Sequence, residues 1–321
     1  MKRYIIIDGL NFFIRSFTVN PTMDVNGAHI GGFLGFLMGL NKLIRENNPT
    51  DVLVIWDGEG GSLKRRSMYK DYKAGRKPKL NRQYDFENVD EQIVSFAHQI
   101  NMLNEYLDYL PVTAIKINGL EADDVIAYLC NLVLDNEDQK IIVSTDKDFY
   151  QLLSNNVTIY VPTKKKYITI KELKDTVNIL PENFILMKAL MGDNSDNVKG
   201  IKGIGEKTVI KLFPFLSEKI CELKDIFNHA DENKDKNIKY KSIISQREII
   251  INNVSIMQLS SQSMNPLFAK IIRQKALKKD TQYKPTAMRI QLTRDGIQLN
   301  VADFFVNFKD FSNKKSILQG K

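Results

Sequence analysis

The sequence has few of the residues from which redox, thiolate and histidine sites are built. Its 321 residues include two cysteines and three histidines. Cys130 and Cys221 form no CxxC pair, so a thiolate zinc site is not indicated, and we expect two buried free thiols in a reducing compartment. The scattered histidines leave catalytic triads and histidine-bound metals without support. Any metal site in this chain must therefore be built from carboxylates.

Long apolar runs are also lacking. No stretch reaches the ~18 residues that a membrane span needs, and the apolar run at 4–7 is too short for a signal peptide. We therefore expect a cytoplasmic protein with no membrane partner. Hydrophobic residues make up 43% of the chain, enough to bury the core of one large domain or two modest ones.

The positive charge is concentrated in one segment. The net charge is +8, and residues 62–82 carry nine basic side chains against one acid, Asp71, which accounts for the whole excess. A local positive field on a balanced body favours a polyanionic partner, nucleic acid first. Most charge runs are simply solvated surfaces, but Tyr69 and Tyr72 lie among these cations and favour a strand-gripping role.

Apolar, β-branched runs alternate with helical periodicity in the first half of the chain. Helical spacing of apolar residues fills 30–44 and 121–134. The alternation predicts an α/β fold with a mostly parallel central sheet and flanking helices, and residues 157–170 predict a hairpin. The predicted strands are 4–7, 52–56, 112–117, 141–144 and 157–161.

The strand pattern fades after Pro181, a residue that suits a first helical position. We expect a helix over 182–191, a second one starting near Gly205, and a polar loop over 231–240.

Three regions follow from this pattern. They are an α/β core over 1–180, a helical region over 181–260 and an extension over 261–321 whose structure the sequence leaves uncertain. The end of the extension, 314–321, has two open interpretations: a partner-binding tail or a disordered basic end.

Carboxylates follow three of the predicted strands. Asp8, Asp57 and Asp146 each come at the end of an apolar run. The carboxyl ends of parallel strands lie along one edge of a sheet, where ligands bind, so we expect these acids to converge. A single acid after a strand is usually a turn residue or a helix cap, but three in one chain are harder to explain in that way.

Six further acids occur in clusters. Helix capping explains one or two of them, but not several together, because their mutual repulsion needs a compensating cation. They are Glu121, Asp123 and Asp124 in EADD, Asp148 in STDKD, and Asp193 and Asp196 in GDNSDN. Nine converging carboxylates cannot all stay ionised in a dry cleft without metal, and oxygen-only ligation selects Mg²⁺ or Mn²⁺ over zinc. Two such ions ~4 Å apart are the usual device for attack of water on a phosphodiester.

In their order and spacing, these motifs resemble the 5′-nuclease superfamily, which includes flap endonucleases, the 5′-nuclease domain of bacterial DNA polymerase I and stand-alone phage enzymes. The motifs are IIID ending at Asp8, WD ending at Asp57, YKAGR at 72–76, EADD at 121–124, STDKDFYQLL at 144–153 and GDNSDNVKGIKGIGEKT at 192–208. No polymerase region follows them, so the chain most resembles a stand-alone phage ribonuclease H.

The resemblance implies a PIN-like 5′-nuclease core, a helical arch or clamp within 58–110 and a helix–three-turn–helix motif at about 185–215. It also implies two metal sites for Mg²⁺, with Mn²⁺ as a substitute. The first site would comprise Asp8, Asp57, Glu121, Asp123 and Asp146, with Asp124 nearby, and the second Asp148, Asp193 and Asp196, with Asp146 near both.

For the arch, the resemblance implies contacts to the substrate. Lys73 would touch the scissile phosphate and act with Asp146 as a catalytic residue, while Tyr72 would stack on an unpaired base. Arg76 completes the motif. The upstream arginine is Arg65 or Arg66, and we assign Arg65 with the alternative left open.

The glycine-rich segment 200–208 would hold duplex DNA. Gly203 and Gly205 let backbone amides approach a phosphate, and the resemblance adds a K⁺ ion held by backbone carbonyls. Alone, the segment reads equally well as an ordinary loop between helices. Its place directly after GDNSDN favours the binding role, to which Lys199, Lys202 and Lys207 would contribute.

The function implied is a Mg²⁺-dependent, structure-specific 5′-3′ nuclease. Its substrates would be DNA with a 5′ end or flap and RNA–DNA hybrids, and its task the removal of RNA primers during lagging-strand replication. We expect a monomer in the cytoplasm, that of the host if a phage encodes it, with a single-stranded DNA-binding protein or a sliding clamp as partner. The alternatives are a catalytically silent protein that binds branched DNA and a PIN-type ribonuclease that acts on single-stranded RNA.

Overall fold

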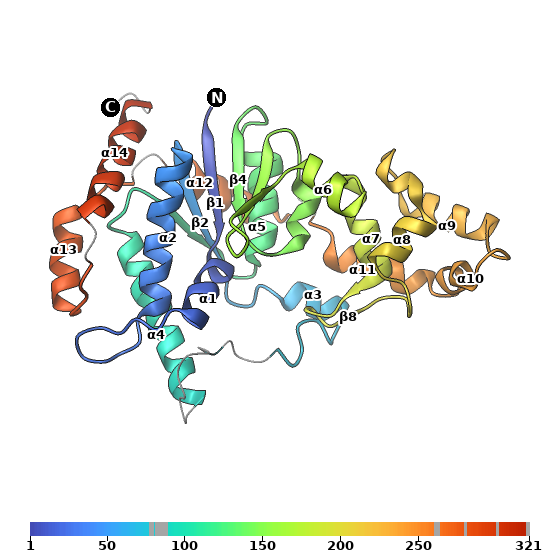
Figure 1. The fold of residues 1–321 in the computed structure, drawn as a ribbon, viewed down its shortest axis with the longest axis horizontal. Coiled ribbons are helices and arrows are strands. Elements are labelled where there is room, and N and C mark those ends of the chain that lie inside the picture. The colour runs from blue at the N-terminus through green and yellow to red at the C-terminus, as the bar shows by residue number, and fades with distance from the viewer. Residues whose placement is uncertain (77–79, 81–88, 260–263, 279–280, 300–301, 319–321) are drawn as a thin grey trace.

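The computed structural model describes residues 1–76, 80, 89–259, 264–278, 281–299 and 302–318. Part of the basic segment and of the predicted arch lies outside these ranges, including Lys77, Lys79 and Arg82. Figure 1 shows a central sheet with a helical region on one side and two C-terminal helices, α13 and α14 (Pro285–Arg294 and Ala302–Leu318), on the other.

In the described residues, six strands form the main sheet in the order β3-β2-β1-β4-β5-β6, and only the last pairing is antiparallel. The predicted parallel sheet and the hairpin of β5 and β6 are therefore confirmed. The strands are β1 (Arg3–Asp8), β2 (Asp51–Trp56), β3 (Thr113–Lys116), β4 (Gln139–Val143), β5 (Val157–Val161) and β6 (Lys166–Ile168).

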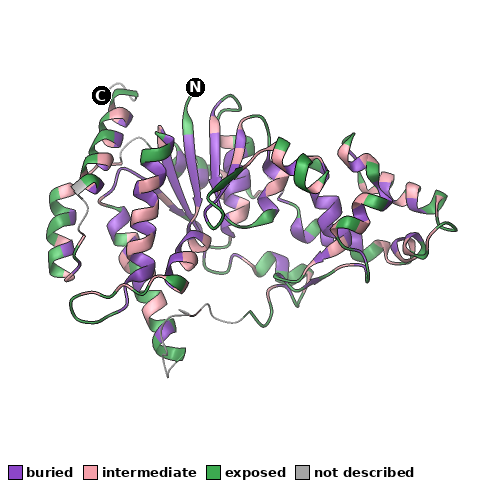
Figure 2. Ribbon diagram, viewed as in Figure 1, coloured by how far each residue is buried: buried purple, intermediate pink, exposed green. Residues whose placement is uncertain are grey.

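Helices cover both faces of this sheet. Successive residues of β1 and β2 point to opposite faces, and residues on both faces are therefore buried (Figure 2). Ile5 and Val54 belong to the core of one face, and Ile6 and Leu53 to the core of the other. The helices up to residue 177 are α1 (Gly9–Val19), α2 (Gly31–Asn47), α3 (Leu63–Met68), α4 (Val89–Leu107), α5 (Ala122–Tyr128), continued by a π-helix η1 (Leu129–Val133), a 3-10 helix η2 (Lys147–Leu152) and α6 (Ile170–Val177).

The helical region contains the two helices expected after Pro181 and joins them through a small hairpin. Its elements are η3 (Pro181–Asn183), α7 (Phe184–Met191), β7 (Gly192–Asp193), β8 (Val198–Lys199), α8 (Glu206–Leu212), η4 (Pro214–Ser217), α9 (Leu223–Glu232), α10 (Ile238–Ser245), α11 (Arg247–Met257) and α12 (Pro266–Ala276). Its buried residues are continuous with one core of the sheet, so the region packs directly on the α/β part.

The loop expected over 231–240 is present but shorter than predicted. It is confined to the turn between α9 and α10, because α9 extends to Glu232 and Asn237 caps α10. Of the two interpretations left open for 314–321, a disordered end does not fit the structure as far as Leu318, where α14 ends.

Lys315 explains why α14 is ordered. Its ammonium group lies 2.9 Å from the Asp51 carboxylate and is almost fully buried, while Phe304, Phe308 and Phe311 of the same helix enter the core beside α2. The extension therefore completes the cover of one sheet face.

Both cysteines are free and buried, as predicted. None of the described helices combines the length and apolar character that crossing a bilayer demands.

Candidate active site

The acids that follow β1, β2 and β4 lie at neighbouring positions along the carboxyl edge of the sheet. Asp8 ends β1 and caps α1 by accepting from the Asn11 amide at 3.3 Å. The Ser144 hydroxyl donates to Asp8 at 2.9 Å and accepts from the amide of Asp146 at 3.1 Å. A single serine therefore connects the first strand end to the acid-bearing turn after β4.

The EADD motif forms the tightest carboxylate cluster of the described residues. Ligand oxygens of Glu121, Asp123 and Asp124 lie within 4.8 Å of one another at the start of α5. Asp57 joins this cluster to the strand edge, since its carboxylate accepts from the Ala122 amide at 2.9 Å. The chain thus places the motif beside the end of β2.

Arg65 of α3 neutralises much of that cluster. Its guanidinium donates twice to Asp124, at 2.8 and 3.1 Å, and once to Asp123 at 3.3 Å, and it also contacts Glu121. Its Nε donates to the Ile256 carbonyl at 2.9 Å, which ties α3 to the end of α11. Arg66 is exposed. Arg65 is therefore the arginine of the pair that reaches the acids.

The turn after α3 brings a lysine and a tyrosine onto Glu121. Lys73 pairs with one Glu121 oxygen, and the Tyr72 hydroxyl donates to the other at 3.1 Å. Lys73 holds a positive φ of 54°, a conformation uncommon for residues other than glycine, and its amide donates to the Asp196 carbonyl at 2.9 Å. This turn therefore connects the basic segment to both acidic motifs.

Burial of Tyr72 conflicts with its predicted role. The side chain is 2% exposed and packs in the core, with its hydroxyl on Glu121. Such a buried ring cannot stack on a base in this arrangement, and Lys73 and Arg65 lie 5.0 and 5.9 Å from its centroid. The sequence showed an aromatic among cations but not that it would be buried.

A second group of acids surrounds Lys188 of α7. Its ammonium lies 2.6 Å from the Asp148 carboxylate and also pairs with Asp193. Asp196 pairs with Arg76 from the basic segment. Sequence reasoning missed Lys188, although a lone lysine inside the apolar run FILMKALM was a visible signal of a buried partner.

The pKa values reflect this crowding. Burial and the neighbouring Asp57 raise the pKa of Asp8 to about 7. Burial and Asp146 raise the pKa of Asp148 to about 7 as well. Burial also acts to raise the pKa of Asp193, but hydrogen bonds from Lys188 and Ser195 outweigh it and lower that pKa to about 2. The site thus combines acids whose pKa is raised, Asp8 and Asp148, with one whose pKa is lowered, Asp193.

The hairpin region beside these acids is built around close backbone contacts. Asn253 donates to the carbonyls of Ala189 and Lys199, at 2.9 Å each, and fixes the hairpin onto α7. A Cβ on Gly203 or Gly205 would meet no atom within 4 Å, so both backbones are open to solvent. The exposed lysines here are Lys199, Lys202 and Lys207.

The donor set fits hard divalent cations. Every acid named above offers carboxylate oxygens, and none of the described side chains in these contacts supplies sulfur or imidazole. Two of the carboxyl groups have pKa values near 7 and thus carry the electrostatic strain that a bound cation relieves. Such oxygen sites suit Mg²⁺ or Mn²⁺.

Two family models cover most of the chain. Residues 3–178 match the 5′-3′ exonuclease N-terminal resolvase-like domain, and residues 179–279 match the 5′-3′ exonuclease C-terminal SAM fold. The acid-edged sheet followed by this helical fold defines a nuclease. The chain belongs to the 5′-3′ exonuclease family.

Individual relatives agree with this assignment. The flap endonuclease Xni of Shewanella woodyi is 32% identical over 271 residues, which are 81% of this chain and 99% of that protein. The 5′-3′ exonuclease of Buchnera aphidicola is 30% identical over 72% of this chain and 75% of its own length. DNA polymerase I of Bacillus subtilis is 30% identical over 75% of this chain, but only 26% of the polymerase is matched.

Solved structures share the fold. A T5 5′-exonuclease with bound divalent zinc ions has a TM-score of 0.66 at 21% identity, over 92% of this chain and 98% of that one. A bacteriophage T5 flap endonuclease in a pseudo-enzyme–product complex with DNA and metal ions has a TM-score of 0.66 at 20% identity, over 97% and 100% of the two chains. The predicted fold class is therefore confirmed.

Because the pKa of Asp8 is raised, we predict that replacing it with the neutral asparagine increases the free energy of unfolding at high pH but not at low pH. The folded state holds this proton more tightly than the unfolded chain, so the stability it contributes is fully present near pH 4 and is lost as pH rises through 7. Asp8→Asn keeps a capping side chain and should raise the unfolding free energy of metal-free protein by roughly 2 kcal/mol at pH 8, with little change at pH 4.

Urea denaturation in EDTA at both pH values measures this difference. Asp175→Asn, at an exposed position of α6, is the matched control and should change nothing. A loss of stability in Asp8→Asn at pH 8 would mean that the charged carboxylate stabilises the fold.

Proposed function

We propose that this protein is a Mg²⁺-dependent, structure-specific 5′-3′ nuclease that acts on DNA with a 5′ end or 5′ flap and on RNA annealed to DNA. The observation that carries the proposal is the contact between the basic segment and the acidic motifs, seen in the pairs of Arg65 and Lys73 with EADD and of Arg76 with GDNSDN. Such a site joins metal ligands to groups that bind phosphate. A phage flap endonuclease of the same fold has a structure with DNA and metal ions.

The acids would hold two Mg²⁺ ions, or Mn²⁺ in their place. When bound, such ions supply a nucleophilic hydroxide and stabilise the leaving oxygen of a phosphodiester. The residues proposed for the first ion are Asp8, Asp57, Glu121, Asp123 and Asp146, with Asp124 nearby, and for the second Asp148, Asp193 and Asp196, with Asp146 near both.

Lys73 is the proposed phosphate-binding catalytic residue. Its side chain is 19% exposed while paired with Glu121, which is 5% exposed, so Lys73 lies nearer to solvent than the carboxylate it pairs with. A divalent ion at Glu121 would compete for that carboxylate, and the released ammonium would neutralise charge on the scissile phosphate. Arg76, half-exposed on Asp196, would act in the same way on a neighbouring phosphate.

Arg65 and Tyr72 have a proposed role that differs from direct phosphate binding by Lys73 and Arg76. Both are buried against the acids, and Arg65 also contacts the end of α11. We assign Arg65 to substrate binding through its hold on the EADD motif. Base stacking by Tyr72 would require the turn at 69–76 to move away from Glu121.

The helical region would hold the duplex next to the cleavage site. Open backbone at Gly203 and Gly205 permits close approach of a phosphate, with Lys199, Lys202 and Lys207 around it. A K⁺ ion bound by backbone carbonyls of residues 200–208 is part of this proposal. Under it, residues 1–180 form the nuclease core and 181–260 the duplex-binding region.

The proposed cellular task is removal of RNA primers and adjacent DNA during lagging-strand replication by a monomeric enzyme. A single-stranded DNA-binding protein or a sliding clamp is the proposed partner. A silent branched-DNA-binding protein would have no need of nine acidic positions, all of which are filled. A PIN-type ribonuclease would have no use for the hairpin region at 192–208.

Loss of Asp146 should separate cleavage from binding. Asp146→Ala should lower turnover of a 5′-labelled flap in Mg²⁺ by at least about 100-fold, because its carboxylate serves both proposed ion sites. Flap affinity should change little. A gel assay with the flap and with an RNA–DNA hybrid, each in Mg²⁺ and in EDTA, measures this.

Asp175→Ala is the control and should cleave normally. Tight binding of the flap by the natural sequence without cleavage in Mg²⁺ or Mn²⁺ would replace the nuclease with the silent binder. Cleavage of single-stranded RNA in preference to the flap would favour the ribonuclease.

The hairpin lysines should set the salt dependence of duplex binding. Changing Lys202 and Lys207 together to alanine should reduce the slope of log affinity against log salt by about 2, since each lost phosphate contact removes about one counterion. Fluorescence anisotropy with a labelled duplex across a salt series gives the slope. Lys171→Ala with Lys174→Ala, on exposed α6 positions, is the matched control, and equal slopes in both double variants would place the duplex elsewhere.

A further inference from the structure

The tip of the β7–β8 hairpin is bonded to the turn that carries Lys73. The Lys73 amide donates to the Asp196 carbonyl at 2.9 Å, and the side-chain amide of Asn197 donates to the Asp71 carbonyl at 3.0 Å. Figure 1 shows β8 close to the chain that follows α3. Both bonds involve backbone groups of the turn at 71–76, so they fix the path of the chain wherever the Lys73 ammonium lies.

The backbone conformation of Lys73 needs such support. Lys73 and Asn197 have positive φ angles of 54° and 59°. Asparagine adopts this conformation more readily than most residues, whereas lysine has no such preference. An unfavourable backbone conformation persists only where the surroundings hold it. The hairpin tip supplies that support through its carbonyl bond to Lys73 and through its side-chain bond to Asp71.

The hairpin has its own anchor in the helical region. Its two strands pair with each other, and Val198 is buried with 2% of its surface exposed. Asn253 of α11 donates to the carbonyls of Ala189 and Lys199, which fastens the hairpin to α7. The tip is therefore held from the helical region, independently of the turn that it contacts.

The side-chain pairs of the turn end on carboxylates. Lys73 pairs with Glu121, and Arg76 pairs with Asp196. Under the proposed function both of these acids bind cations, so these pairs are not available to hold the turn during the reaction. The bonds made by the Lys73 amide and by the Asn197 side chain use no carboxylate oxygen. They are compatible with occupied acids.

We propose that Asn197 is a positioning residue, which keeps the turn of Lys73 beside the acidic cluster when the Lys73 ammonium moves from Glu121 to a phosphate. The inference rests on the proposed function, since that function gives Lys73 its phosphate-binding role. A group held in place before the substrate binds reduces the entropic cost of the reaction. Asn197 is exposed and acts through Asp71, so changing its side chain leaves the core intact.

The first test is hydrogen exchange in EDTA, measured by mass spectrometry on peptides from the turn. Asn197→Gly permits the same positive φ but removes the donor. We expect the amides of Lys73 and Ala74, both bonded in this turn, to exchange about 5-fold faster, the factor that one ordinary hydrogen bond contributes. Asn197→Asp also removes the donor, without the flexibility of glycine, and should have the same effect.

Asn178→Gly is the matched control for this measurement. Asn178 is a second exposed asparagine with a positive φ, 58°, at the end of α6. Its replacement should leave exchange in the turn of Lys73 unchanged.

The second test is a double-mutant cycle on cleavage of a 5′ flap in Mg²⁺. Asn197→Gly should lower kcat at least ~10-fold with little change in KM, because it misplaces a group that acts in the transition state. Adding Asn197→Gly to Lys73→Ala should cause little further loss, because both changes act through the same ammonium. A residue with a merely structural role would give additive losses.

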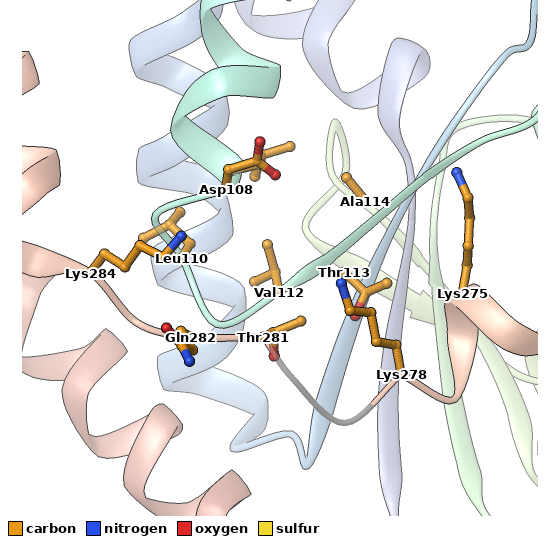
Figure 3. Close-up of a pocket in the computed structure, with 11 residues that line it drawn as sticks. Asp108, Leu110, Val112, Thr113, Ala114, Lys275, Lys278, Thr281, Gln282 and Lys284 are labelled. Atoms are coloured by element: carbon orange, nitrogen blue, oxygen red, sulfur yellow. The ribbon is translucent and has the colours of Figure 1, made fainter.

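Lys278→Ala is the control for the cycle. Figure 3 shows Lys278 beside Thr113, which begins β3, and this end of the strand is opposite the acids. Lys278→Ala should cleave normally, and Asn197→Gly should lower kcat by the same factor with or without it.

Three results would overturn the proposal. They are unchanged exchange in Asn197→Gly, faster exchange in Asn197→Gly but not in Asn197→Asp, and additive losses of kcat with Lys73→Ala. Failure of the proposed function gives a different result, since the natural sequence itself would then not cleave the flap. The exchange measurement in EDTA requires no cleavage and would still show whether Asn197 holds the turn.

Discussion

Repulsion among carboxylates is the constraint on which the arrangement of this protein depends. Parallel strands bring Asp8, Asp57 and Asp146 to one edge, and two further motifs add to the negative charge. Without cations such a cluster is unstable. The chain supplies them from three different segments: Arg65 from α3, Lys73 from the following turn and Lys188 from α7. Charge neutralisation thus fastens the basic segment and the helical region to the sheet.

The same pairs connect stability to function. Lys73 and Arg76 occupy carboxylate oxygens that the proposed metal ions need, so in the proposed mechanism the binding of metal would release these two side chains. A released Lys73 or Arg76 becomes available to a phosphate beside the acids. The buried Arg65 differs, since its Nε is held by the Ile256 carbonyl as well as by acids. It is suited to remain in place and hold the EADD motif.

Much of the fold was predictable because the local spacing of apolar residues indicates strands and helices. The strand that ends at Asp8 and the strand that precedes Asp57 are apolar on both faces, as a sheet covered on both sides requires. The C-terminal helices were not predictable, because α14 combines Phe304 and Phe308 with a buried Lys315 whose partner, Asp51, lies far away in the chain. At the site, residue types identified the acids. They did not reveal that Tyr72 is buried or that Lys188 joins two motifs, since both facts depend on contacts between distant segments.

The most direct test of whether metal ions compete with the basic side chains for these carboxylates is a count of bound Mn²⁺. Free Mn²⁺ is measured by electron paramagnetic resonance in the absence of nucleic acid. We predict saturable binding of two ions per chain, and at least ~10-fold weaker binding when Glu121→Gln and Asp148→Asn are combined. Lys73→Met should bind the ions more tightly than the natural protein, because it removes a competing cation. Absence of saturable binding, or equal binding in the acid variant, would contradict the assignment of these carboxylates to metal.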